Sequence, residues 1–158
     1  MALTSDIVES WRRPRAVIRR LRSRGRSEAF VFTFLLVFLM MAVTAAAPGL
    51  SRQAALEGQP FPPFLLGASL GALALVPVFY LLAALGHLVA RLMGGTGGWY
   101  DGRLALFWAL ACTTPAVLLF GLVRAFVADS PAVPILGLFT FMVFLALYSI
   151  MLREVEGQ

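Results

Sequence analysis

Four long apolar stretches dominate this chain and restrict it to one class of fold. They occupy residues 29–47, 64–90, 104–127 and 133–152. Each matches or exceeds the roughly 20 residues that a helix needs to cross a ~30 Å hydrocarbon layer. The sequence therefore predicts an all-α protein, a polytopic membrane helix bundle with four transmembrane helices.

Composition supports this class of fold. The chain is 60% hydrophobic and 13% charged, whereas soluble globular domains carry about 25% charged residues. Its 158 residues leave room for one membrane domain. The predicted segments are a basic amphipathic interfacial segment (1–27), a four-helix transmembrane domain (28–153) and a short cytoplasmic tail (154–158). The single Cys112 cannot form a disulfide within the chain and is expected to be a small packing residue.

Arginine is distributed unequally between the predicted sides of the membrane. Residues 1–27 contain eight of the thirteen Arg residues, against only Asp6 and Glu9. Such a segment resists translocation, so we expect it in the cytoplasm. Four crossings then place both termini and the loop at 92–102 in the cytoplasm, with eleven Arg on that side and Arg52 and Arg124 on the other. The predicted location is the bacterial inner membrane.

A cleaved signal peptide is the alternative for the first apolar stretch, because residues 45–47 are three alanines. The stretch before them is longer than the 7–15 residues typical of a signal peptide, and Pro48 would become the first mature residue. We therefore expect a retained helix.

The amino-terminal segment has apolar residues at helical spacing, with arginines on the other face. Pro14 should divide it into a helix near residues 5–12 and a second helix that opens at the proline. This pattern is typical of a helix in the headgroup layer, and we expect Trp11, Ile18 and Leu21 to enter the leaflet. Docking of an acidic partner is an alternative. Nucleic-acid binding is disfavoured, because Trp11 is the one Trp of this segment and gives no interleaving of aromatic and basic residues. The residues expected to contact anionic lipids or a partner are Trp11, Arg12, Arg13, Arg15, Arg19, Arg20 and Arg22.

Two features of the apolar stretches concern helix packing. Gly67 and Gly71 are four residues apart, so they predict a close helix contact, with simple apolar filler as the alternative. Pro77 and Pro115 should each kink a helix, and Thr114 is placed to bond the carbonyl freed by Pro115. Paired kinks also occur in transporters, but no acidic or basic residue lies near the middle of any stretch, which disfavours coupled transport.

The sequence contains no recognisable catalytic or cofactor motif. It has no Ser/His/Asp set, no zinc-protease motif and one histidine, so we predict no enzyme activity, no cofactor and no metal. His87 and Arg91 are expected to contact headgroups, with a ligand or catalytic site as the alternative. The Gly-rich loop at 93–103 lacks the Lys-Ser/Thr of a phosphate-binding loop. We expect instead a tight reversal between two helices, made by Gly94, Gly95, Gly97 and Gly98.

This loop and its flanks resemble the centre of the Yip1-domain family. In bacterial members a helix ends in a Gly-Gly turn, and the next helix carries a proline near its middle. The matching residues are His87, Leu88 and Pro115 with residues 91–98 and 104–110. The opening Trp11-Arg12-Arg13-Pro14 is similar to the family's amino-terminal proline segment, and residues 152–157 resemble the stretch that follows a later crossing.

The resemblance implies a membrane scaffold or organising protein. Family members commonly have five crossings, and this chain stops where the fifth would begin. It also lacks the acidic and aromatic cytosolic motif of the eukaryotic relatives that bind Rab GTPases, so Rab binding does not carry over.

We therefore predict a non-enzymatic inner-membrane protein that organises or assembles other membrane components. Its expected partners are anionic lipids and other membrane proteins or a second copy of itself. The alternatives are an accessory subunit of a larger membrane complex and a small-molecule transporter.

Overall fold

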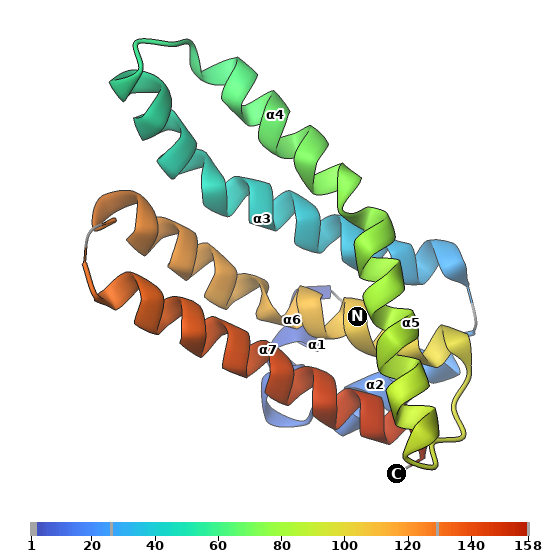
Figure 1. The fold of residues 1–158 in the computed structure, drawn as a ribbon. Coiled ribbons are helices and arrows are strands. Elements are labelled where there is room, and N and C mark those ends of the chain that lie inside the picture. The colour runs from blue at the N-terminus through green and yellow to red at the C-terminus, as the bar shows by residue number, and fades with distance from the viewer. Residues whose placement is uncertain (1–2, 26, 129, 158) are drawn as a thin grey trace.

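The structure is a computed structural model that describes residues 3–25, 27–128 and 130–157. Every regular element within these residues is a helix (Figure 1). In chain order the helices are α1 (Leu3–Arg12), α2 (Pro14–Ser23), α3 (Glu28–Leu56), α4 (Phe61–Ala74), α5 (Val76–Leu92), α6 (Trp99–Phe126) and α7 (Ala132–Glu156).

Among the described residues, four helical segments are long and apolar enough to cross a membrane, as predicted. They are α3, the α4–α5 pair, α6 and α7, and the shortest has 25 residues. An ion pair between Arg103 and Glu28 joins the starts of α6 and α3, and a hydrogen bond between His87 and Glu156 joins the ends of α5 and α7. These four helix ends therefore meet at one end of the bundle, which we call the ion-paired end.

The two prolines predicted to kink a helix, Pro77 and Pro115, have different effects. At Pro77 the second crossing is broken, because α4 ends at Ala74 and α5 starts at Val76, with the proline in its first turn. As a result α4 packs on α3, while α5 turns away to pack on α6 and α7 (Figure 1). Pro115 lies inside an uninterrupted α6. There the Thr114 hydroxyl donates to the Ala111 carbonyl over 2.8 Å, which confirms the predicted compensation.

Helix α6 is the centre of the bundle. Of residues 100–114, all but Arg103 are buried. Trp108 and Phe107 are fully enclosed, and their rings make edge-to-face contacts with Phe34 of α3 and Tyr80 of α5 at centroid distances of 4.7 and 5.1 Å. Such pairs add about 0.5–1.5 kcal/mol each beyond the burial of their area. The first half of α6 is thus enclosed by other helices, including α1 and α2.

The outer helices present apolar side chains outward. None of the residues described in α4 is buried, and Leu66, Leu81 and Ile135 on α4, α5 and α7 are 60%, 60% and 67% exposed. Monomeric soluble proteins rarely expose contiguous apolar surfaces of this extent. The surface is therefore suited to contact with lipid.

Gly67 and Gly71 do not pack against another helix of this chain. A methyl group added at either position would meet nothing within 4 Å. The close contact occurs instead at Gly121 of α6, where an added methyl would lie 2.2 Å from the Ala45 carbonyl oxygen of α3. The predicted contact through Gly67 and Gly71 is thus wrong within the chain, and a contact with a second protein stays a prediction.

Candidate functional site

A buried histidine–carboxylate pair lies at the ion-paired end. His87 Nδ1 is 2.6 Å from Glu156 Oε1, and the two side chains are 1% and 0% exposed. The imidazole also lies against the Trp99 ring, with centroids 4.7 Å apart. The expectation that His87 contacts headgroups is therefore wrong, because this side chain is enclosed where α5 meets α7. Its Nε2 is buried without a hydrogen-bond partner in the described part of the chain.

Glu156 also anchors the Gly-rich loop. Its second carboxylate oxygen accepts the Gly97 N–H over 2.9 Å, and its backbone carbonyl accepts the Thr96 N–H over 2.8 Å. A Cβ at Gly97 would come within 2.8 Å of that carboxylate. Glycine is therefore required by this close approach.

The same loop ends α5 with a Schellman turn. Gly94 has a φ of +94°, which favours glycine. The Gly95 N–H donates to the Ala90 carbonyl over 2.9 Å, and the Gly94 N–H donates to the Arg91 carbonyl over 3.1 Å. These two bonds satisfy carbonyls that a helix end otherwise leaves free. The loop is thus the tight reversal that the sequence predicts.

Asp101 begins the next helix and receives an arginine from the amino-terminal segment. Its Oδ2 accepts the Gly98 N–H over 3.0 Å and lies 2.8 Å from Arg22 Nη2. The carboxylate is fully buried. A negative charge at a helix amino terminus is favourable, because it interacts with the helix dipole. Arg22 therefore links α2 to the first turn of α6.

Helix α1 buries two polar side chains against the bundle. Asp6 and Ser10 are 3% and 0% exposed, whereas Leu3, Val8 and Trp11 are 37%, 64% and 44% exposed. Thr4, Ser5 and Arg12 are exposed as well, and Ile7 packs against the core. The outer face of α1 is therefore mixed, with large apolar side chains such as Val8 and Trp11 among polar ones.

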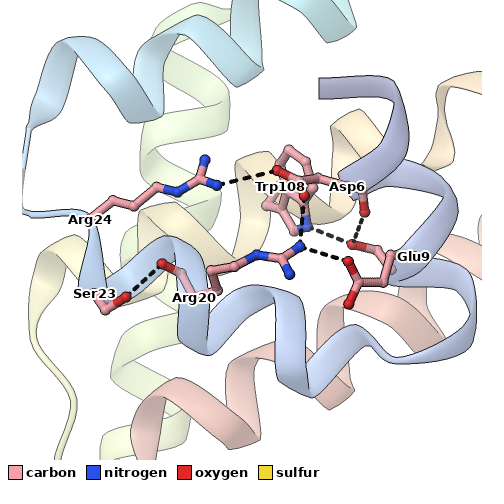
Figure 2. A network of polar contacts seen from close by, with 7 residues as sticks. Asp6, Glu9, Arg20, Ser23, Arg24 and Trp108 are labelled. Carbon is pink, nitrogen blue, oxygen red and sulfur yellow. Dashed lines mark hydrogen bonds and ion pairs between the residues drawn. The ribbon is translucent and has the colours of Figure 1, made fainter. Parts of the chain in front are cut away.

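Each buried polar group of α1 has a partner. Arg20 Nη2 lies 2.7 Å from both Asp6 and Glu9, and Arg24 reaches Asp6 at 3.8 Å (Figure 2). The hydrogen bond to Glu9 raises the pKa of Arg20 above its ordinary value, which keeps the guanidinium charged. The α1–α2 hairpin is thereby closed on itself.

Two tryptophan hydrogen bonds fasten this hairpin to α6. Trp108 Nε1 donates to the Ser10 hydroxyl over 3.0 Å, and Trp11 Nε1 donates to the Cys112 carbonyl over 2.9 Å. Cys112 is thirteen positions along α6 from its start at Trp99, which is about 20 Å at 1.5 Å per residue. Helix α1 therefore contacts the bundle well inside its ion-paired end.

Helix α2 buries the apolar side chains that we expected in the leaflet. Ile18 and Leu21 are 0% and 1% exposed, and α2 packs on α7 and α6. The prediction that these two residues enter the leaflet is therefore wrong. Arg19 of α2 pairs with Glu154 of α7 at 2.9 Å, and Arg15 approaches the same carboxylate at 3.8 Å.

The remaining arginines of this end face outward. Within the described part of the chain, no ion pair forms at Arg12, Arg13, Arg91 or Arg153, and all four are exposed. Of the seven residues predicted to contact lipid or a partner, Arg12 and Arg13 thus face outward, and Trp11 is 44% exposed although its Nε1 donates to the Cys112 carbonyl. Arg15, Arg19, Arg20 and Arg22 also serve contacts within the chain. Arg26 lies outside the described residues.

These groups provide no assembled metal centre. No three His, Cys, Asp or Glu residues come together among the described residues in a way that could hold a metal ion. The arrangement fixes helices and loops to one another, and its outer surface carries charge and apolar side chains.

Sequence reasoning missed the His87–Glu156 pair because the two residues are 69 positions apart. Each was visible separately, as the single histidine and as an acidic residue at the end of the last apolar stretch. It also missed Gly121, although Gly121 and Ala125 repeat the four-residue spacing of Gly67 and Gly71.

Comparison with known proteins identifies the class of this bundle. The Yip1 domain family matches residues 8–157, which is nearly the whole chain. The chain therefore belongs to the Yip1-domain family, a family of non-enzymatic membrane proteins. No curated protein and no solved structure matches the chain significantly.

Proposed function

We propose that this protein is a non-enzymatic scaffold that organises other components of the bacterial inner membrane, with both termini in the cytoplasm. The observation that carries the proposal is that the buried ionisable groups at the ion-paired end hold loops and helix ends in place. His87, Asp101 and Glu156 are buried and tied to loops and helix ends, so they support a fixed shape. The surface available to partners is then the apolar outer faces and the outward arginines.

The test of this proposal compares two charge reversals in the full-length protein. Arg12→Glu with Arg13→Glu reverses outward charge without touching a described ion pair, whereas Arg22→Glu places a carboxylate beside buried Asp101. Isolation in mild detergent after crosslinking in native membranes should recover the same set of membrane proteins from wild type in several independent preparations. The double variant should lose that set while keeping its own thermal stability. Unchanged recovery in the double variant would contradict a partner surface at these arginines.

The accessory-subunit alternative predicts a different outcome in the same isolation. A fixed subunit would be recovered at a constant ratio to one large complex, and its own stability would fall when that complex is absent. Scaffolding instead predicts partners at variable ratios and a chain that is equally stable alone.

We also propose that α1 lies in the cytoplasmic leaflet near the headgroup boundary, with Val8 and Trp11 toward lipid. The exposure of Val8 and Trp11 on the outer face supports this proposal, because large apolar side chains are more favourable in an apolar surrounding than in water. The exposed Arg12 and Arg13 follow directly and would reach anionic headgroups, each adding roughly 1 kcal/mol of attraction.

Spin labels test the position of α1 in vesicles. In a Cys112→Ala background, a label at Val8→Cys should be accessible to oxygen and protected from a water-soluble nickel reagent. A label at Ala16→Cys, on the exposed face of α2, should show the reverse. If both labels prefer the nickel reagent, α1 is in water and the proposal fails.

A further inference from the structure

A groove runs between α3 and α6 toward the end of the bundle opposite the ion-paired end. Its volume is about 550 Å³. It begins where Ala45 and Gly121 bring the two helices together, and its lining combines small residues such as Ala42, Ala46 and Gly49 with larger apolar ones from both helices. Small side chains on α3 leave a trough that neighbouring helices of this chain do not fill.

Two arginines stand at the outer part of this groove. Arg52 and Arg124 both line it, and they are the two arginines that the charge distribution assigns to the side opposite the basic segment. Arg52 Nη1 donates to the Ala125 carbonyl over 3.1 Å, which holds its guanidinium across from α3 to α6. Arg124 is exposed and forms no ion pair in the described part of the chain.

The surrounding polar groups leave both guanidinium groups available. Gln53, which also lines the groove, donates to Glu57 over 2.8 Å, and neither Arg52 nor Arg124 forms an ion pair in the described part of the chain. Arg52 keeps four of its five N–H donors for a ligand after its single bond to Ala125. Because guanidinium groups bind phosphate oxygens with two parallel hydrogen bonds, this pair suits a phosphate.

We propose that the groove binds an acidic phospholipid, with the headgroup phosphate between Arg52 and Arg124 and one acyl chain along Ala42, Ala46 and Gly49. Charge complementarity identifies the headgroup, and the apolar trough that continues from it identifies the chain. Arginine on the translocated side opposes the usual charge bias of membrane proteins. Both arginines on that side, Arg52 and Arg124, line the same groove. A ligand with a negative charge and an apolar tail explains this placement.

The experiment measures lipid retention by the full-length protein with native mass spectrometry, and its thermal stability in neutral micelles with added phosphatidylglycerol. Wild type should retain phosphatidylglycerol in preference to phosphatidylcholine and should be stabilised by it. Arg124→Gln should bind phosphatidylglycerol about tenfold more weakly, because a charge-assisted contact is lost. Ala46→Phe, which fills the trough at an exposed position, should reduce retention without disturbing a described hydrogen bond.

Two controls make the result decisive. Arg91→Gln removes an exposed, unpaired arginine from the ion-paired end and should retain phosphatidylglycerol as wild type does. Soluble glycerol phosphate should give no stabilisation at the concentrations at which the lipid acts. Equal retention of both lipids by wild type, or an equal loss in Arg91→Gln, would overturn the site. Full stabilisation by glycerol phosphate would show a headgroup site without a lipid chain and would overturn the phospholipid assignment.

Discussion

Replacing Glu156 with alanine should destabilise the ion-paired end more than any other change of one carboxylate on α7. The substitution leaves His87 Nδ1 and the Gly97 N–H without their partner in a site where both side chains of the pair are almost fully enclosed. Leaving a buried hydrogen-bonding group without its partner costs about 1–3 kcal/mol. We expect a loss of this size in the free energy of unfolding.

Glu154→Ala is the matched control, because it removes the same charge from the same turn of α7. Glu154 is one-fifth exposed, and its partner Arg19 is 67% exposed. Exposed ion pairs contribute only about 0–1 kcal/mol. The difference between the two variants therefore isolates the buried contacts from the change in net charge.

Equilibrium unfolding in mixed micelles measures both variants, and hydrogen–deuterium exchange reports on the loop directly. In Glu156→Ala the amides of residues 93–98 should exchange faster, because Gly97 and its neighbours lose their anchor. Glu156→Gln should fall between the two alanine variants, since an amide oxygen can still accept from Gly97. If Glu156→Ala and Glu154→Ala lose the same stability and the loop stays protected, the pair does not hold this end together.

Three further predictions follow from the packing and the topology. Gly121→Leu should destabilise the bundle by at least about 2 kcal/mol in the same unfolding assay, because the side chain meets backbone of α3, whereas Gly67→Leu should change stability by less than about 0.5 kcal/mol. Comparable losses in both would contradict the assigned contact. Arg22→Ala should cost about 1–3 kcal/mol, because buried Asp101 loses its charged partner, and Arg12→Ala should be close to neutral. Reporter fusions at the carboxyl terminus and within residues 51–59 should report opposite sides of the membrane, and the same side for both would refute the four-crossing topology.

The sequence predicts the helices better than it predicts their contacts. A run of apolar residues is sufficient to indicate a crossing, and Pro14 and Pro77 indicate where a helix must begin or break, because proline lacks an N–H. The spacing of Ile18 and Leu21 indicates an apolar face on α2. It does not indicate whether lipid or protein covers that face, since both are apolar. The structure shows that α6 and α7 cover it.

The spacing of small residues likewise does not indicate which helix face contacts another helix. Gly67 with Gly71 and Gly121 with Ala125 have the same four-residue spacing, yet only the second pair meets a neighbouring helix. The break before Pro77 swings α4 and α5 apart, so α4 packs on α3 with another face. Such an outcome depends on the direction of a whole helix and is not encoded in the local spacing.

Arginines of the amino-terminal segment form ion pairs in the folded chain and are also predicted to orient the chain during insertion. Within the folded chain Arg15, Arg19, Arg20, Arg22 and Arg24 are paired with carboxylates of α1, α6 and α7. Five of the eight arginines in this segment are therefore paired once the bundle has formed, with four carboxylates between them. We expect the orientation to be decided earlier, while the segment is unpaired, with little contribution from carboxylates. Replacing Glu154 with Gln should accordingly leave the topology unchanged, although Arg19 then loses its partner on α7.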